Sequence, residues 1–168
     1  MILLLLLICL AENKIVIKRK IKNERSIEVA AGLVFREGRL LITRRRANDH
    51  LGGLWEFPGG KRESDETFAE CLRRELKEEL GVKVDVGELV ETITHDYPKE
   101  TVHLKFYRCT LRSRDLQAIG CDAFAWIGAD ELDAYPFPRA DERLLEKLRR
   151  SPALWRPRVF RKTPRRPS

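Results

Sequence analysis

The chain has 168 residues, which is enough for one domain with a buried core and too few for two comfortable ones. Its four cysteines form no C-x-x-C pair, so neither a zinc knuckle nor a disulfide framework is indicated, and we expect reduced thiols in a cytoplasmic protein. The net charge of +7 arises at the two ends of the chain. Residues 1–26 carry six basic and two acidic side chains, and residues 151–168 carry six basic and no acidic ones. The middle part, residues 27–150, carries 21 basic and 24 acidic side chains and is therefore slightly acidic.

Residues 1–26 form an N-terminal extension that is first apolar and then basic. The apolar run over residues 1–11 is shorter than the roughly 20 residues that a membrane-spanning helix needs. It also lacks the basic start and the cleavage site of a signal peptide. We expect no firm membrane partner, and a membrane-anchored form is a minor alternative. The extension is read either as an additional strand or as a segment upstream of the natural start of the domain.

Residues 27–150 carry the pattern of a single α/β domain. Apolar and β-branched runs predict strands at 29–35 and 40–43, joined by a hairpin connection, and further strands at 84–94, 101–111 and 123–127. Helices are expected at 68–80 and 140–150. Strands on both sides of a helix, followed by a closing helix, predict a mixed β-sheet sandwiched between helices.

The helix at 68–80 has local start and stop signals. Thr67, followed three residues later by Glu70, is a capping-box pattern, and Gly81 supplies a left-handed stop. The apolar stripe that faces the core comprises Ala69, Leu72, Leu76 and Leu80.

Three glutamates of this helix, Glu75, Glu78 and Glu79, fall within a wedge of roughly 100° beside the apolar stripe, so we expect them to converge. Carboxylates at these spacings repel one another, and a shared cation would relieve the repulsion. Oxygen ligands without Cys or His at ligand spacing favour Mg²⁺ or Mn²⁺ over zinc. A merely solvated acidic face is the alternative, and the fixed positions of the surrounding glycines argue against it.

The stretch from Gly59-Gly60-Lys61 through Gly81-Val82 resembles the Nudix box, with Glu66, Arg74-Glu75-Leu76 and Glu78-Glu79-Leu80 at the required spacing. The flanking words Leu-Ile-Thr-Arg-Arg at 41–45 and Trp-Glu-Phe-Pro-Gly-Gly at 55–60 resemble in particular the MutT branch of the Nudix family. The resemblance covers about residues 28–150. It implies the α/β/α Nudix sandwich.

The resemblance also implies a site for a divalent ion, Mg²⁺ or Mn²⁺, with ligands from the Gly59 carbonyl, Glu75, Glu78 and Glu79. The implied catalytic residues are Arg74, Glu75, Glu78 and Glu79. One of Glu78 and Glu79 would orient or deprotonate the attacking water, and Glu78 is favoured.

Two further residues, Glu66 and Gly60, would support this site without touching the ion. Arg74 is expected to pair with a carboxylate and so fix the loop against the helix.

Substrate contacts are implied for Arg45, Glu56, Phe57 and Asp141. Arg45 stands where the family places a phosphate-binding arginine, and solvated arginines at a strand end are the alternative reading. Asp141 ends the word Phe-Pro-Arg-Ala-Asp at 137–141, in which the family has asparagine as the base-reading residue. An ionised carboxylate could accept from the ring N–H and amine of a guanine-like edge, but could not donate to a keto oxygen. Helix capping is the competing role for Asp141.

A second departure from the family pattern lies at Gly120-Cys121, where many relatives have a Glu or Glu-His pair. Asp115, Gln117 or Asp122 could replace that contribution in part, or the box could work alone. His95 and His103 lack metal-ligand spacing and are read as structural or pocket-lining.

The expected activity is that of a Mg²⁺-dependent nucleoside triphosphate pyrophosphohydrolase of the MutT type, which releases a nucleoside monophosphate and pyrophosphate. Oxidised dGTP (8-oxo-dGTP) is the leading substrate, consistent with nucleotide-pool sanitation and DNA repair. Hydrolysis of CTP or dCTP, or of another nucleoside-diphosphate-linked compound, is the alternative. A non-catalytic Nudix module that binds modified bases or RNA is the competitor from another class. Residues 151–168 are read as a basic tail with weak nucleic-acid contact as an option. A monomer and a homodimer are both open.

Overall fold

A mixed β-sheet of seven strands forms the middle layer of the computed structural model, which describes residues 26–98, 100–113 and 115–156. Its central path runs in the order β3 (Trp55–Glu56), β2 (Arg39–Arg44), β1 (Ser26–Arg36), β6 (Thr101–Leu111) and β5 (Val84–Asp96). Two further strands join this path, since β4 (Gly59–Lys61) pairs with β1 and β7 (Ala123–Ile127) pairs with β2. The pairing of β1 with β6 is parallel, and the other pairings are antiparallel.

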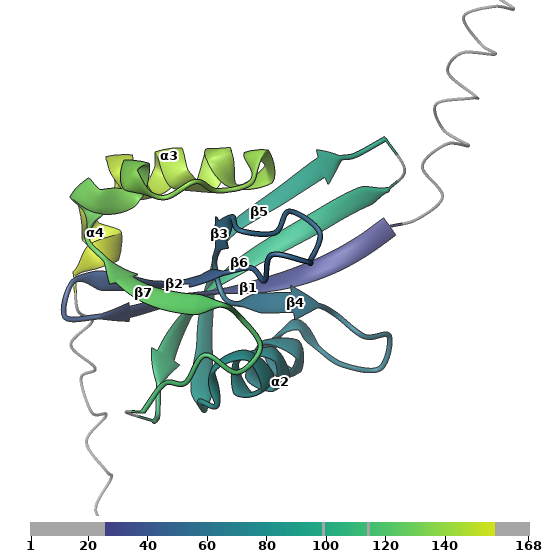
Figure 1. Ribbon diagram of the computed structural model, residues 1–168, viewed down its shortest axis with the longest axis horizontal. Coiled ribbons are helices and arrows are strands. Elements are labelled where there is room, and N and C mark those ends of the chain that lie inside the picture. The colour runs from purple at the N-terminus through teal and green to yellow at the C-terminus, as the bar shows by residue number, and fades with distance from the viewer. Residues whose placement is uncertain (1–25, 99, 114, 157–168) are drawn as a thin grey trace, which may run out of the picture.

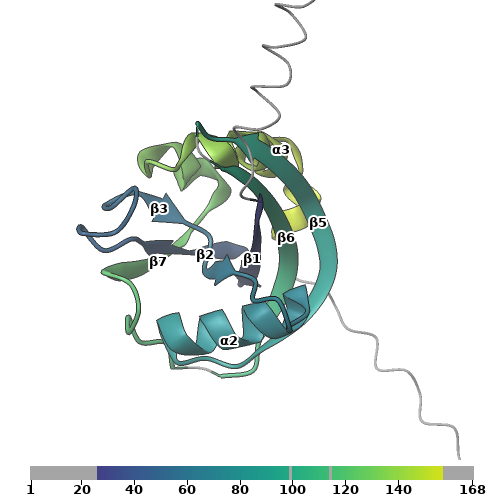
Figure 2. The same ribbon diagram turned by 90° about the vertical axis from the view of Figure 1, so that its right-hand side faces the viewer.

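Helices cover both sides of the sheet, as Figures 1 and 2 show. Helix α2 (Phe68–Leu80) lies on one side, and α3 (Glu142–Arg150) with the short α4 (Pro152–Trp155) lies on the other. This arrangement confirms the predicted α/β class with a mixed sheet between helices. Among the described residues, no helix has the length and apolar character that crossing a membrane would take.

Each helix layer closes its own hydrophobic core against the sheet. On the α2 side, Leu72, Leu76 and Leu80 are fully buried with strand residues such as Val34 and Leu41. On the α3 side, the apolar stripe of that helix meets Leu33, Ile42 and Phe106, and its buried members are Leu144, Leu145 and Leu148. The predicted stripe of α2 therefore faces the sheet, as does the apolar side of α3, and the two cores fix both helices relative to the strands between them.

The structure differs from the predicted end of the domain at residue 150. Pro152–Trp155 forms helix α4, and Trp155 is buried with its ring edge against Phe35, at 5.6 Å between centroids. The Trp155 Nε1–H donates to the Leu148 carbonyl at 3.0 Å, and Arg108 donates to the Leu154 carbonyl at 2.8 Å. Residues 151–156 therefore belong to the folded domain, because Trp155 has an apolar site to fill.

Two of the predictions concern residues outside the described part of the chain. These are the alternatives for the N-terminal extension up to residue 25 and the basic tail from residue 157 onward.

Three cysteines, Cys71, Cys109 and Cys121, are free and buried. Burial raises the pKa of the Cys71 and Cys109 thiols to about 12 and that of Cys121 to about 11. The thiol form therefore predominates at neutral pH in all three.

Candidate active site

Helix α2 begins and ends where the sequence predicts. The Thr67 hydroxyl oxygen accepts a hydrogen bond from the Glu70 amide at 3.2 Å, and the Glu70 carboxylate accepts one from the Thr67 amide at 2.8 Å. Gly81 closes the helix with φ 70°, and its amide donates to the Lys77 carbonyl at 3.0 Å. These caps fix the register of the helix and hence the directions of its glutamates.

The glycine pair lies in β4, between β1 on one side and α2 on the other. Gly59 has φ 153°, and a Cβ there would lie 2.1 Å from the Ala30 carbonyl oxygen. A Cβ on Gly60 would lie 2.3 Å from the carboxyl carbon of Glu75. Only glycine therefore lets β4 approach both neighbours so closely.

Arg74 makes the pairing expected of it. Its Nη2 and Nε donate to the two carboxylate oxygens of Glu66 at 2.6 and 3.1 Å, its Nη1 donates to Glu75 at 2.8 Å, and its Nη2 donates to the Lys61 carbonyl at 3.1 Å. Hydrogen bonds from Arg74 and then from the Glu63 amide lower the pKa of Glu66 to about 2. The guanidinium thus fastens the loop before α2 to the helix.

The predicted convergence of three glutamates is met by two of them. Glu75 packs against Gly60, and Glu79 accepts a hydrogen bond from the Gly59 amide at 3.2 Å. Glu78 is 60% exposed and lies 3.5 Å from Arg74 instead. Among the described residues, no three acidic, histidine or cysteine side chains are gathered closely enough to hold a metal ion. Glu75 and Glu78 share Arg74 Nη1 as a partner, at 2.8 and 3.5 Å, so Arg74 links these two carboxylates while Glu79 lies apart at Gly59.

Glu79 is the box glutamate that reaches the interior. Burial raises its pKa to about 8, and the nearby carboxylates of Glu56 and Glu75 add to the effect. Crowded carboxylate oxygens next to a backbone turn are the donor set that Mg²⁺ and Mn²⁺ prefer. A divalent cation therefore fits the chemistry of this corner.

Arg45 follows directly after β2 and points into the interior. Its Nη1 pairs with the Glu56 carboxylate at 2.5 Å, while its buried Nε has no hydrogen-bond partner within the described part of the chain. Burial raises the pKa of Glu56 even though Arg45 opposes the shift. The neighbouring arginines lie elsewhere: Arg44 is 4.0 Å from Asp122, and Arg46 donates to the Ile119 carbonyl at 2.6 Å.

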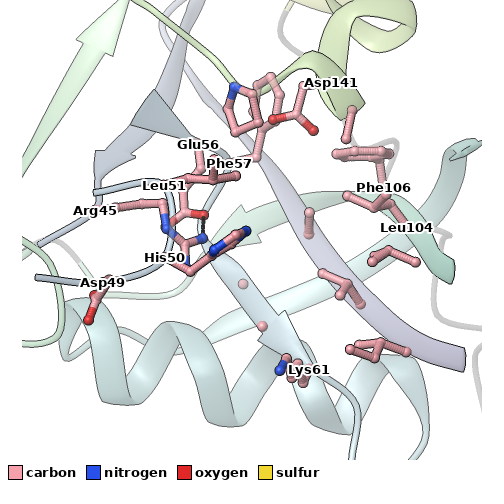
Figure 3. A pocket seen from close by; sticks show the side chains of 18 of the residues that line it. Arg45, Asp49, His50, Leu51, Glu56, Phe57, Lys61, Leu104, Phe106 and Asp141 are labelled. Atoms are coloured by element: carbon pink, nitrogen blue, oxygen red, sulfur yellow. Dashed lines mark hydrogen bonds and ion pairs between the residues drawn. The ribbon is translucent and has the colours of Figure 1, made fainter. Parts of the chain in front are cut away.

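A cavity of about 490 Å³ brings Arg45, Glu56 and Glu79 together (Figure 3). It opens between β1, β6 and the segments that follow β2 and β7. The predicted site residues that line it are Arg45, Glu56, Phe57, Gly59, Gly60, Glu79 and Asp141. Those that do not line it are Glu66, Arg74, Glu75 and Glu78.

Asp141 is only 5% exposed and faces the cavity. The residue closes the 3₁₀ turn Arg139–Asp141 that precedes α3, and its side chain makes no capping hydrogen bond. Burial raises its pKa to about 7, with Glu56 adding to the shift and Arg45 opposing it. Asp141 therefore stands at the N-cap position of α3, as the capping alternative expects, without the side-chain hydrogen bond of a cap.

Several lining residues escaped the sequence analysis. Val102, Leu104 and Phe106 form an apolar wall on one face of β6, and Tyr97 stands in the turn between β5 and β6. The i, i+2 spacing on the predicted strand was the available signal for the wall. The remaining lining residues that carry a polar or charged side chain are Asp49, His50, Lys61, Glu100 and Cys121.

The loop that contains Gly120-Cys121, where many relatives have a Glu or Glu-His pair, packs against the C-terminal end of α2. The Gly120 amide donates to the Glu79 carbonyl at 3.0 Å, and a Cβ on Gly120 would lie 2.9 Å from the Glu79 Cα. Cys121 lines the cavity, but the three suggested substitutes, Asp115, Gln117 and Asp122, do not.

Neither of the two histidines discussed above lines the cavity. The His95 ring lies edge-on to Tyr97 at 4.5 Å between centroids, and His103 Nδ1 lies 2.9 Å from the Thr94 hydroxyl. His95 therefore contacts a residue that lines the cavity, Tyr97.

Comparison with known proteins gives a consistent result. A model of the NUDIX domain family matches residues 30–147. The chain is 38% identical over 122 residues to the CTP pyrophosphohydrolase of Escherichia coli (strain K12), covering 73% of this chain and 90% of that protein. It is 33% identical over 128 residues to the 8-oxo-dGTP diphosphatase of Haemophilus influenzae, covering 75% and 93%.

Solved structures give the same picture. The solution structure of the E. coli ORF135 protein superposes with a TM-score of 0.67 at 36% identity, covering 77% of this chain and 93% of that one. A MutT NUDIX hydrolase from Burkholderia pseudomallei superposes with a TM-score of 0.66 at 25% identity, covering 73% and 98%.

Proposed function

The chain belongs to the NUDIX family as a hydrolase of the MutT type, and we propose that it converts a nucleoside or deoxynucleoside triphosphate into the monophosphate and pyrophosphate. One observation carries this proposal. The cavity of about 490 Å³ holds the box glutamate Glu79, the cationic Arg45 and the buried Asp141 in a single continuous space. A nucleotide would fit this space. Its polyphosphate binds cations such as Arg45, and its base needs an apolar surface with a polar group at the edge.

NUDIX hydrolases generally use divalent metal ions, and Mg²⁺ or Mn²⁺ is the ion that we propose here. Glu75, Glu78, Glu79 and the Gly59 carbonyl would hold it. When bound, such an ion neutralises charge on the phosphate oxygens and lowers the pKa of a coordinated water.

The chain's own residues would divide the remaining work. Arg45 offers N–H donors to the phosphate oxygens, and Glu56 holds its guanidinium in place. Phe57 and the neighbouring apolar wall would take the base. We assign to Glu78 the orientation or deprotonation of the water that attacks an internal phosphorus, because a carboxylate next to a bound ion suits that task. Arg74 and Glu66 would keep the loop and helix in register.

The leading substrate is 8-oxo-dGTP, as relatives named 8-oxo-dGTP diphosphatases suggest, and the role would then be removal of oxidised nucleotides from the pool. CTP or dCTP is the second candidate. It is favoured by the similarity to a CTP pyrophosphohydrolase and by aspartate in place of the family's base-reading asparagine.

A panel of ordinary and oxidised nucleoside triphosphates with Mg²⁺, scored for monophosphate and pyrophosphate, tests the proposal. Glu78→Gln should lower kcat on the best substrate by roughly 10²- to 10⁴-fold, because it removes the group that handles the water's proton. Glu146→Gln is the matched control, since it removes a carboxylate from the exposed side of α3, where Glu146 pairs with Arg150 at 3.5 Å.

The control should turn over like the wild type. A Glu78→Gln variant with wild-type kcat would remove the assigned role, and a panel without any pyrophosphate release would remove the proposed activity.

A further inference from the structure

Two buried side-chain atoms within the described ranges 26–98, 100–113 and 115–156 have no hydrogen-bond partner, and both belong to residues that flank Glu56. They are the Thr43 hydroxyl oxygen and Arg45 Nε. Arg45 Nη1 donates to Glu56 at 2.5 Å (Figure 3), and Thr43 lies directly opposite Glu56 in the pairing of β2 with β3. A buried polar group without a partner costs free energy, so each of these atoms gains from a rearrangement that supplies one.

The neighbours of Thr43 identify the group that its hydroxyl can reach. Thr43 is fully buried and does not line the cavity, so a nucleotide in the cavity does not touch it. Residues directly opposite on paired strands, and residues two positions apart along one strand, share a face of the sheet. The neighbours of Thr43 on its face are Leu41, Arg45, Glu56 and Phe124. Of these four side chains, only the Glu56 carboxylate can accept a hydrogen bond.

Glu56 also gains from a second donor. A carboxylate has two oxygens that both accept hydrogen bonds, and Arg45 donates to its Oε2. Burial raises the pKa of Glu56, the nearby carboxylates of Asp49 and Glu75 add to the effect, and Arg45 opposes it. A phosphate that draws on the Arg45 charge therefore weakens the support of the Glu56 carboxylate at the moment when the substrate binds.

We propose that Thr43 is a positioning residue for the polyphosphate. When a phosphate oxygen takes Arg45 Nε, the Thr43 hydroxyl donates to Glu56 and holds the carboxylate that orients the Arg45 guanidinium. This inference rests on the proposed hydrolysis of nucleoside triphosphates. Both atoms without a partner obtain one in the same rearrangement, and Thr43 acts on the substrate through Glu56 and Arg45.

Exchange of Thr43 for Val and for Ser separates the hydroxyl group from the rest of the side chain. Thr43→Val keeps the branched shape and removes the hydroxyl, whereas Thr43→Ser keeps the hydroxyl and removes the methyl group. For each variant, the measurements are the thermal unfolding midpoint without nucleotide, and kcat and KM for the best triphosphate of the panel with Mg²⁺. Thr92→Val is the matched control, since it makes the same exchange at an exposed position of β5.

The two variants should change stability and substrate binding in opposite directions. Thr43→Val should raise the unfolding midpoint, because it removes a buried hydroxyl that has no partner in the free protein. Its KM should rise roughly tenfold or more, because the complex loses a hydrogen bond to a charged group. Its kcat should change by less than about threefold, because Arg45 holds the polyphosphate alike in the ground state and in the transition state.

Thr43→Ser should keep KM close to the wild-type value, because it retains the hydroxyl. Its unfolding midpoint should fall, because it loses a buried methyl group. Thr92→Val should match the wild type in KM and kcat.

Different outcomes contradict the inference and the activity on which it rests. A wild-type KM in Thr43→Val, or a KM in Thr43→Ser that rises as much as in Thr43→Val, would overturn the inference and leave the proposed function standing. A Thr43→Val variant that unfolds below the wild-type midpoint, or does not fold, would also overturn it, because the hydroxyl would then have a partner in the free protein. Wild-type protein that releases no pyrophosphate from any triphosphate would overturn both.

Discussion

Glu66 is the residue whose environment gives the simplest pH prediction. Its pKa falls from 4.5 to about 2, chiefly through the hydrogen bonds from Arg74. A carboxyl group with a lowered pKa in the folded state contributes stability that is present above its unfolded pKa and is lost as the pH falls through its folded pKa. The window for this pair therefore runs from about pH 4.5 down to about pH 2.

Glu66→Gln should lower the free energy of unfolding at neutral pH and should flatten its decline within that window. Urea unfolding midpoints measured across the acid range check this. Glu63→Gln is the matched control, because Glu63 contacts Glu66 and Arg62 through its backbone only. Equal slopes for the two variants would show that the Arg74 pair contributes no pH-dependent stability.

At the scale of elements, we expect the two glycines of β4 to have different roles: Gly59 is needed for stability and Gly60 for the reaction. Gly59→Ala places a Cβ 2.1 Å from a carbonyl oxygen of β1 at a positive φ, so it should lower the free energy of unfolding by roughly 2 kcal/mol or more. Gly60→Ala meets the movable end of the Glu75 side chain instead. It should leave the unfolding midpoint nearly unchanged while kcat falls roughly a hundredfold, because it displaces a carboxylate of the box.

Thermal unfolding and turnover measured on both variants check the pair. Wild-type turnover in Gly60→Ala would show that the position of Glu75 does not matter for the reaction.

Local signals determine which elements the sequence predicts well. Helix Phe68–Leu80 has both of its caps within the sequence, strand Thr101–Leu111 has apolar side chains at alternating positions, and strand Ala123–Ile127 is a continuous apolar run. All three were predicted to the residue. Strands β3 and β4 were missed because their words are rich in glycine and proline, and only pairing with β2 and β1 makes them strands. Helix α3 begins at Glu142 rather than at 140 because a 3₁₀ turn precedes it.

The residues of the candidate site also fall into those that the sequence predicts and those that it does not. The residues of the cavity that motif words identify, such as Arg45, Phe57 and Asp141, do come together. Tyr97 was missed because no motif includes it and its place depends on how far the β5–β6 turn reaches. The exposure of Glu78 was missed because helical spacing gives the direction of a side chain but not how far the neighbouring loops cover it.

For the molecule as a whole, α4 completes the hydrophobic core on the α3 side of the sheet. Trp155 is 7% exposed and bonds the Leu148 carbonyl, so Trp155→Ala should lower the free energy of unfolding by about 3–5 kcal/mol. Arg156→Ala, at the exposed next position, should change it little. Denaturant unfolding of both variants is the measurement. Equal stability of the two variants would show that residues 151–156 do not contribute to the folded domain.

The three buried sulfurs have a consequence for life under oxidative stress. Peroxide attacks thiolates rather than thiols, and Cys71, Cys109 and Cys121 hold their protons because burial raises their pKa values to about 11 or 12. Sulfenic acid therefore forms slowly at these positions in the folded domain. The folded domain should therefore keep these three thiols in their reduced form at peroxide concentrations that oxidise an exposed cysteine of ordinary pKa.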